Sequence, residues 1–502
     1  MYFRELTEMI RKDSRLKLLL TAAVVVQVIT CITAVGHYHP DQHFQLIEFS
    51  SYQLHQPSAA GKVWEFSAHL RSTIQVYLFS AYSRLCMGLG IGDPYVQLEV
   101  LRLVFGLTLW VFFNGITLYY FRRGGRPILY LVLLLLNFSW ILPYTRTLFS
   151  SEMLSSLLFF GALFLYENGK RSWGMALLTG FLFSLAFYAR FQTAFAIAGF
   201  LVWMLWPGRR QGILPLALGF LPGVFLNTVL DHGFYHQWVC TPYTYFRVNI
   251  LEGKAASMGT SSFLVYIAVL AAVVLTPPMS IFLLFAGFRT SLLKKLDHPL
   301  VLSVVFFIVG HCLVAHKEER FLFPIVNVLP IIVGWGLPGL IDWVRSRRRG
   351  WRGLIRGIGW FSAGLNVFLL SVLLFTPYSQ AIHFTSQLRN NFRDRDKPAT
   401  IYAVGRTPFE TEHHLPFVFY RTRTDNMRFK VVGDSDSLRL LPDTVEYITT
   451  TYDQLIGKKV LPDSLGYQRV LYSSRLLWGV NETLESIGMN TINDIWVLYK
   501  KR

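Results

Sequence analysis

A short polar run, from His37 to Glu48, carries two carboxylates that could act in acid–base chemistry. Asp41 directly follows a proline, and Glu48 lies about two helical turns beyond it, so both could share one helix face. A carboxylate at the mouth of a groove can take a proton from a substrate hydroxyl. The simpler alternative for Asp41 is a helix cap, in which the side chain accepts backbone N–H groups.

A second run, His316-Lys317-Glu318-Glu319-Arg320, places five ionisable residues in a row between two apolar stretches. Lys317 and Arg320, with His316 beside them, could hold a phosphate, while Glu318 or Glu319 fixes their geometry. A solvated turn is the alternative, which the shortness and mixed charge of the run weaken.

Two further cations, Arg146 and Arg190, stand at the ends of apolar stretches. Each could add charge to a phosphate site. A single arginine at such a position more often extends its side chain towards water.

The segment 231–262 alternates aromatic and polar side chains, among them Tyr235, Trp238 and Asn249. This pattern suits contact with a sugar or a lipid headgroup. An interfacial helix with an aromatic belt explains it equally well.

The elements that carry these residues are apolar. The chain has 502 residues, of which 53% are hydrophobic and only 16% charged, against about a quarter charged in soluble proteins. Apolar stretches near bilayer length recur, which predicts about eleven transmembrane helices. The predicted spans are 18–36, 97–120, 127–143, 151–167, 174–189, 194–206, 213–230, 263–288, 300–315, 323–341 and 355–376.

The net charge of +18 does not indicate a nucleic-acid partner, because the basic residues concentrate in short segments between spans. Such segments face the cytoplasm. They include 1–17, 121–126, 168–173 with Lys170 and Arg171, 207–212, 289–299 and 342–356. With a cytoplasmic N-terminus all six fall on one side, and the polar runs described above fall on the opposite, extracytoplasmic side.

The C-terminal segment 377–502 differs from the rest in being polar, with strand-like runs such as Thr400–Val404 and Ile495–Tyr499. It predicts a small α/β domain outside the membrane. The expected domains are therefore 1–376, an all-α polytopic membrane domain whose first extracytoplasmic loop is 37–96, and 377–502. The four cysteines show no metal-binding spacing.

Several of these motifs resemble glycosyltransferase family 22, the polytopic GT-C mannosyltransferases of N-glycan and GPI-anchor assembly. HKEERF at 316–321 is similar to the hallmark turn of that family, and HPDQHFQLIE at 39–48 is similar to its first luminal loop. TRTLFSSE at 145–152, ARFQTAF at 189–195 and the segment after Asp231 follow in the order the family shows. Gln42 stands where the family has a glutamate, so Glu48 is a candidate replacement.

The resemblance implies a GT-C fold with amphipathic helices in the first loop and an inverting transfer of mannose. The donor would be a polyprenyl- or dolichyl-phosphate mannose, the acceptor a glycan or glycolipid, and neither a cofactor nor a metal ion would be needed. Asp41 would be the general base, and Lys317, Arg320, His316, Arg146 and Arg190 would bind the donor phosphate. Supporting or acceptor residues would be Glu48, Glu318, Glu319, Tyr235, Trp238 and Asn249.

Two alternatives remain open from the sequence. One is a transferase of the same architecture for another lipid-linked sugar. The other is a transporter of lipid-linked sugar, although transporters usually show internal repeats or broken helices around a site near the membrane midplane. The active side would be the periplasm in a bacterium and the endoplasmic reticulum lumen in a eukaryote, and the sequence does not indicate an oligomeric state.

Overall fold

A computed structural model describes residues 2–169, 172–206, 209–395, 397–421, 426–456, 458 and 461–502. Lys170 and Arg171, part of a predicted cytoplasmic segment, lie outside the described residues. The chain divides into two compact units, which we describe separately. Unit 1 consists of Met1–Ala34, Ala68–Leu78 and Val100–Thr376, and unit 2 of Val35–Ser67, Phe79–Glu99 and Pro377–Arg502.

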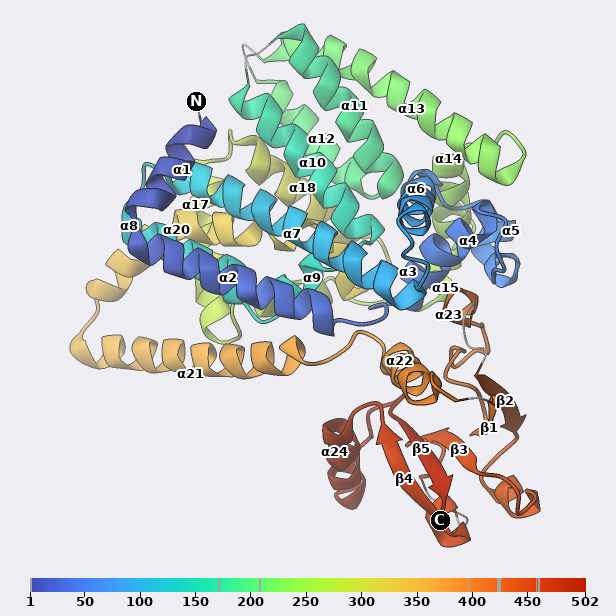
Figure 1. The fold of residues 1–502 in the computed structure, drawn as a ribbon. Helices are drawn as coiled ribbons and strands as arrows, with labels where there is room; N and C mark the ends of the chain where they lie inside the picture. Colours follow the sequence, from blue (N-terminus) through green and yellow to red (C-terminus); the bar gives the residue numbers. More distant parts are fainter. Residues whose placement is uncertain are drawn as a thin grey trace. The chain divides into compact units, whose positions relative to one another are not determined.

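Unit 1 is helical (Figure 1). Two of its helices, α6 and α7, also contribute residues to unit 2. The helices are α1 (Tyr2–Lys12), α2 (Ser14–Thr33), α6 (Ile74–Gly88), α7 (Pro94–Phe121), α8 (Arg126–Phe138), α9 (Leu142–Arg146), α10 (Ser151–Asn168), α11 (Trp173–Ala189), α12 (Thr193–Met204), α13 (Ile213–Tyr235), α14 (Thr241–Phe246), α15 (Lys254–Ser257), α16 (Leu264–Val273), α17 (Met279–Lys294), α18 (Pro299–Leu313), α19 (Phe323–Val326), α20 (Leu329–Arg345) and α21 (Arg349–Leu374).

Among the described residues, four helical stretches are long and apolar enough to cross a membrane: Ser14–Thr33, Pro94–Phe121, Arg210–Tyr235 and Arg349–Leu374. A fifth candidate is the bent pair Glu319–Val326 and Leu329–Arg345, whose two parts meet at 67°. Shorter apolar helices, of 10–17 residues, lie between them. The chain is therefore an integral membrane protein, while the count of about eleven spans stays a prediction.

One predicted span, 263–288, is wrong as a single helix. It is α16 and α17, separated by a break at residues 274–278 that contains Pro277 and Pro278. Proline has no N–H to donate to the preceding turn and forces the residue before it out of helical geometry, so the helix ends before this pair. The predicted span 127–143 likewise ends earlier, at Phe138, before the short helix α9.

Several helices begin where polar side chains satisfy their first N–H groups. Asp13 accepts from the amide of Leu16 at 3.0 Å at the start of α2, and Ser172 accepts from that of Met175 at 3.2 Å at the start of α11. The helix α18 has a similar cap, in which Nδ1 of His298 accepts from the amide of Leu300 at 3.2 Å, and it also has Pro299 in its first turn, where no N–H is needed. These signals explain why the observed starts fall within a few residues of the predicted ones.

Glycines let the backbones of α11 and α13 touch. A Cβ atom on Gly180 would lie 2.0 Å from the carbonyl oxygen of Leu216, and one on Gly219 would lie 2.0 Å from that of Leu177. Small residues at such contacts are the usual means by which membrane helices pack, because lipid tails compete with larger apolar side chains.

Unit 2 contains a five-stranded sheet in the order β2-β1-β3-β5-β4, in which β2, β1 and β3 run parallel and β5 runs antiparallel to both its neighbours. The strands are β1 (Ala399–Val404), β2 (Met427–Val432), β3 (Tyr447–Thr451), β4 (Tyr467–Tyr472) and β5 (Trp496–Lys501). The helices are α3 (Pro40–Gln42), α4 (Phe49–Gln53), α5 (Trp64–Ser67), α22 (Gln380–Phe392), α23 (Val418–Arg421) and α24 (Arg475–Ser486). The predicted strands Thr400–Val404 and Ile495–Tyr499 are confirmed as β1 and β5.

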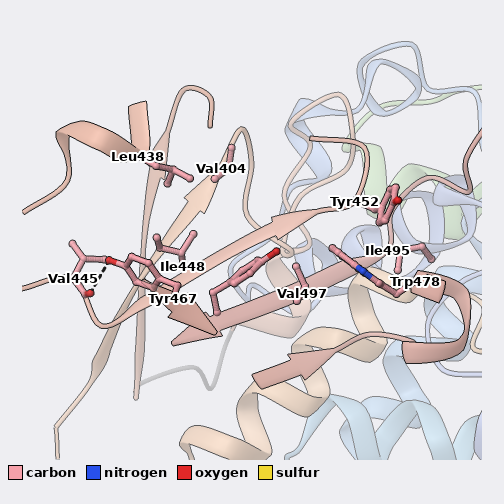
Figure 2. Close-up of a cluster of buried hydrophobic side chains, with 10 residues drawn as sticks. Val404, Leu438, Val445, Ile448, Tyr452, Tyr467, Trp478, Ile495 and Val497 are labelled. Atoms are coloured by element: carbon pink, nitrogen blue, oxygen red, sulfur yellow. Dashed lines mark hydrogen bonds between the residues drawn. The ribbon is translucent and has the colours of Figure 1, made fainter. Parts of the chain in front are cut away.

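Alternating side chains of the strands build a core on each face of this sheet. On one face, shown in Figure 2, Ile448 and Val497 pack with Trp478 of α24. On the other, Ile401 and Leu498 pack with α22. Coverage of both faces is typical of the parallel part of an α/β sheet.

The substitution Gly219→Ala should destabilise the membrane unit by about 1–3 kcal/mol, because the added methyl overlaps the backbone of α11. We expect a lower Tm in detergent. A matched control is Gly115→Ala on α7, where nothing lies within 4 Å of the new Cβ, and which should leave Tm unchanged or slightly raised. Equal Tm values for the two variants would contradict backbone contact between α11 and α13.

Candidate active site

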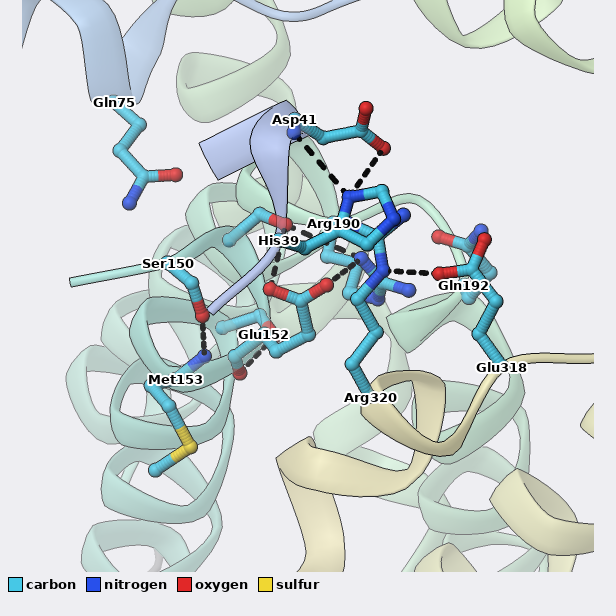
Figure 3. Close-up of polar contacts among 12 residues, drawn as sticks. His39, Asp41, Gln75, Ser150, Glu152, Met153, Arg190, Gln192, Glu318 and Arg320 are labelled. Atoms are coloured by element: carbon cyan, nitrogen blue, oxygen red, sulfur yellow. Dashed lines mark hydrogen bonds and ion pairs between the residues drawn. The ribbon is translucent and has the colours of Figure 1, made fainter. Parts of the chain in front are cut away.

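A buried ion pair joins α10 to the end of α11 in unit 1 (Figure 3). Nη1 of Arg190 lies 2.6 Å from Oε1 of Glu152 and donates to Oγ of Ser151 at 3.2 Å. Both charged side chains are almost fully buried, with 5% and 2% exposure. Among the described residues Nε and Nη2 of Arg190 are buried without a hydrogen-bond partner, so this guanidinium keeps donors for an anion.

The HKEERF turn forms a second charged group in the same unit. Glu318 accepts hydrogen bonds from Arg320 and from Nε2 of His316, the latter at 2.9 Å. Nδ1 of His316 lies 2.9 Å from the carbonyl oxygen of Gly259. Glu318 therefore holds His316 and Arg320, whereas the expected contact with Lys317 is not among its described hydrogen bonds, and Glu319 is exposed.

Electrostatics and ring contacts link this turn to the ion pair. The charge of Arg320 acts on Glu152 together with that of Arg190, and the guanidinium of Arg190 lies 5.0 Å from the ring centre of Phe321. Two arginines thus surround one buried carboxylate. A lipid phosphate that enters such a site would meet fixed cations in a water-poor setting, where charge interactions are strong.

Arg146 lies elsewhere in unit 1 and is wholly buried. Its Nε donates to Oε1 of Gln27 at 2.8 Å, and its Nη1 donates at 3.0 Å to Oδ1 of Asn327 and to the carbonyl oxygen of Leu136. These contacts tie α2, α8, α9 and the residue between α19 and α20 together. They favour a structural role over the predicted phosphate contact.

Lys317 lies partly buried at the end of α18. Its Nζ donates to the carbonyl oxygen of Val314 at 2.5 Å and lies 5.8 Å from the ring centre of Tyr266. The lysine therefore donates to a backbone carbonyl three residues before it, and its role as a phosphate ligand stays a prediction.

Asp41 belongs to unit 2, in the short helix α3, with 34% of its side chain exposed. Its Oδ2 lies 3.4 Å from Nδ1 of His39, which also accepts from the backbone amide of Asp41 at 3.3 Å. The N-cap residue is His39, and Asp41 lies in the first turn of the helix, as the alternative explanation expected. A carboxylate beside an imidazole and open to solvent has the access that a general base requires.

Glu48 is wholly buried in unit 2, unlike Asp41. It lies 2.9 Å from Nε2 of His43 and accepts from the backbone amides of Ala59 at 2.8 Å and Phe419 at 3.0 Å. Burial opposes its ionisation, but the His43 contact and the two amides outweigh burial and hold the pKa of this carboxyl below its usual value. Glu48 thus anchors residues 417–421 to the first loop, which favours its supporting role over acceptor contact.

Three of the residues predicted to support the site or contact the acceptor have different surroundings in the structure. Tyr235 is buried, and its hydroxyl donates to the carbonyl oxygen of Arg71 at 2.8 Å. Trp238 is 71% exposed and stacks on His232, with ring centres 4.1 Å apart. Asn249 donates to the carbonyl oxygen of Tyr245 within its own helical turn at 3.1 Å. Of the three side chains, Trp238 presents the most exposed surface for a ligand.

Neither the pairing of Glu152 with Arg190 nor the contacts of Asp231 were predicted from the sequence. Oδ1 of Asp231 accepts from the backbone amide and hydroxyl of Thr73 at 2.8 and 2.7 Å, and Oδ2 accepts from the hydroxyl of Thr241 at 2.7 Å. Both acids lie at the ends of apolar helices. An ionisable residue in such a helix is a functional candidate by itself, and this signal was available for Glu152.

Residues 18–420 match the family model described as the Alg9-like mannosyltransferase family. Among curated proteins, GPI alpha-1,2-mannosyltransferase 3 of Homo sapiens is 22% identical over 332 residues, which are 65% of this chain and 58% of that protein. GPI mannosyltransferase 3 of Schizosaccharomyces pombe is 20% identical over 420 residues, 76% of this chain and 78% of that protein. The chain spans less than two thirds of the human relative.

Among solved structures, ArnT from Cupriavidus metallidurans bound to undecaprenyl phosphate is similar with a TM-score of 0.49 and 12% identity, over 96% of this chain and 97% of that one. The Archaeoglobus fulgidus oligosaccharyltransferase has a TM-score of 0.45 and 12% identity, over 90% of this chain and 73% of that one.

The buried carboxylate of Glu48 predicts an acid-sensitive unit 2. Because its pKa is lowered by folding, ionised Glu48 adds stability above its unfolded pKa of about 4.3, and this stability is lost as the pH falls through the lower folded value. Glu48→Gln should cost about 1–3 kcal/mol at pH 7 and flatten the fall of Tm in acid.

Thermal unfolding of the purified chain between pH 7 and pH 3 measures this effect. Glu412→Gln, at an exposed residue of the same unit, is the control and should follow the unchanged chain at every pH. A Glu48→Gln profile parallel to that of the unchanged chain would show that Glu48 is not the group that titrates.

Proposed function

The chain belongs to the Alg9-like mannosyltransferase family, and on that premise we propose that it transfers mannose from a polyprenyl- or dolichyl-phosphate donor to a hydroxyl of a glycan or glycolipid. The observation that carries the proposal is Arg190, a buried arginine paired with Glu152 that keeps two unpartnered donor atoms among the described residues. The oxygen atoms of a leaving phosphate monoester could accept hydrogen bonds from these two nitrogen atoms.

In the proposed reaction, the acceptor hydroxyl oxygen attacks the anomeric carbon of mannose while Asp41 takes its proton. The bond between the anomeric carbon and the phosphate oxygen breaks, and the electron pair leaves with the lipid phosphate. Arg190 and Arg320 neutralise the charge that develops there. Attack on the face opposite the phosphate inverts the configuration and forms an α-mannoside.

Burial explains why Arg190 and Arg320 are each paired with a carboxylate. An isolated buried guanidinium costs several kcal/mol, and its partner offsets that cost. Glu152 and Glu318 hold the two arginines in place before the substrate arrives, so little reorganisation is needed during the reaction. Because a lipid monophosphate carries less charge than a nucleotide diphosphate, we propose that no metal ion is required.

We also propose on which side of the membrane each part of the chain lies. The N-terminus would be cytoplasmic and the site extracytoplasmic, because the basic segments concentrate on one predicted side. Residues 1–376 would form a GT-C catalytic membrane domain with about eleven spans, and residues 377–502 an extracytoplasmic domain.

The decisive experiment incubates the purified chain with polyprenyl-phosphate mannose and an α-mannoside glycolipid acceptor. We expect a product longer by one mannose, formed equally in EDTA, and not formed from the glucose or arabinose analogue of the donor. Movement of the donor across vesicles without any covalent product would contradict the proposal and favour a transporter.

The substitution Asp41→Asn should abolish turnover, because an amide cannot accept the proton. A general base contributes about 10²–10⁴-fold to rate, so we expect a loss of at least 100-fold in kcat with unchanged Tm. Glu412→Gln should keep full activity. Transfer by Asp41→Asn near the unchanged rate would remove Asp41 from the mechanism.

The substitution Arg190→Lys keeps the charge opposite Glu152 but removes the two unpartnered guanidinium donors. Hydrogen bonds to charged groups are worth about 1.5–3 kcal/mol, so we expect kcat/KM for the lipid-phosphate donor to fall about 10–100-fold. Arg209→Lys, at a predicted cytoplasmic segment where the arginine lies against Trp203, is the control and should have no effect. Equal kinetics for the two variants would exclude Arg190 from donor binding.

A further inference from the structure

The parallel strands of unit 2 end together at one edge of the sheet. From β1 the chain passes to β2 on one side and then to β3 on the other side of β1. The ends of β1 and β3 therefore flank the point where the strand order reverses. In open α/β sheets, ligands bind outside the carboxyl ends of the strands at such a point.

The two strand ends approach each other closely. Ala403 pairs with Thr449, and the same register places Gly405, just beyond β1, beside Thr451 at the end of β3. Gly405 adopts a left-handed backbone with φ +72°, and a Cβ there would lie 3.2 Å from the side-chain amide of Gln454. The turn after β1 thus needs glycine to pass the residues that follow β3.

Three oxygen atoms at this edge are buried and have no hydrogen-bond partner within the described part of the chain. They are Oγ1 of Thr407, Oγ1 of Thr451 and Oδ1 of Asp453. Thr407 and Thr451 are only 2% and 1% exposed. An unsatisfied buried polar group costs about 1–3 kcal/mol, and such groups are rare enough in folded proteins to need an explanation. A molecule that brings hydroxyl groups would supply the missing partners.

Asp494, just before β5, adds a held carboxylate to the same edge. Its Oδ1 accepts from Nη2 of Arg406 at 2.8 Å and from the indole N–H of Trp496 at 2.7 Å. Its backbone is left-handed, with φ +64°, a strained conformation that is common at functional sites. Asp453 lies close enough to interact electrostatically with Asp494.

The chemistry of the edge selects the class of ligand. The edge holds two carboxylates, Asp453 and Asp494, and one guanidinium, that of Arg406, which already donates to Asp494 and to the carbonyl oxygen of Glu410. A phosphate would meet net negative charge. Sugar hydroxyls donate to a carboxylate and exchange hydrogen bonds with threonine hydroxyls, so a neutral sugar fits all three unpartnered oxygens.

We propose that the carboxyl edge of β1 and β3, formed by Thr407, Thr451 and Asp453, binds a neutral hexose unit of a glycan. The site lies wholly within residues 377–502, of which the family match covers only the part up to residue 420. It deepens the proposed function by naming a glycan as the acceptor, and only that link rests on the proposed function.

Threonine-to-valine changes test the site because they keep side-chain shape. Thr451→Val and Thr407→Val each remove an unpartnered hydroxyl, so Tm of the full chain should stay the same or rise while sugar binding falls. Thr449→Val is the matched control. Its hydroxyl donates to the carbonyl oxygen of Val497 at 3.0 Å, so the change should lower Tm and leave binding intact.

Binding is measured on the purified full chain, without lipid donor, by labelling with a photoreactive α-mannobioside and identifying the labelled peptides. We expect label within 404–408, 451–454 or 492–496, protection by free mannobiose but not by inorganic phosphate, and at least 10-fold less label in both site variants. Label found only elsewhere, unchanged label in both variants, or protection by phosphate would overturn the inference.

This experiment distinguishes failure of the sugar-binding site from failure of the proposed transferase activity. Mannose transfer together with unchanged labelling in the variants would overturn the sugar site and leave the transferase intact. Variant-sensitive labelling in a chain that forms no product would retain the sugar site and overturn the transferase.

Discussion

The pairing of buried charge is the constraint on which this molecule depends. An arginine inside a membrane protein is tolerated only when a carboxylate, a backbone carbonyl or an amide accepts from it. Glu152 meets this requirement for Arg190, and Gln27, Asn327 and a carbonyl oxygen meet it for Arg146. The two arginines differ in how many donors stay unpartnered among the described residues: Arg146, whose partners connect several helices, keeps only Nη2, whereas Arg190 keeps both Nε and Nη2.

The same logic holds unit 2 together outside the apolar helices. Glu48 gathers His43 and two backbone amides from distant segments, so one buried carboxylate joins the first loop to residues 417–421. Asp93 and Arg389 form a second link of this kind, at 2.5 Å between Oδ2 and Nη2, from α22 to the residues that precede α7. Segments that are separated in sequence therefore form one compact unit through a small number of polar contacts.

Apolar stretches and strand-like runs were sufficient to predict most helices of unit 1 and two strands of unit 2, because these signals act over a few neighbouring residues. Pro277 and Pro278 also carried a local signal, and the predicted span 263–288 ignored it. The burial of Arg146 and Glu48 could not be predicted, since it depends on partners more than a hundred residues away. The spacing of Asp41 and Glu48 suggested a shared helix face, but it could not show that one carboxylate is open and the other enclosed.

The glycine contacts between α11 and α13 have a mechanical consequence. With backbone against backbone at Gly180 and Gly219, no flexible side chain separates the two helices to absorb sliding, and the pair behaves as one stiff rod. Asp231, near the end of that rod, holds Thr73. A bilayer of different thickness is met by tilting of helices, so such tilting would carry residues 68–78 along with α11 and α13. Lipid thickness would thereby act on a segment that is predicted to lie in the first extracytoplasmic loop.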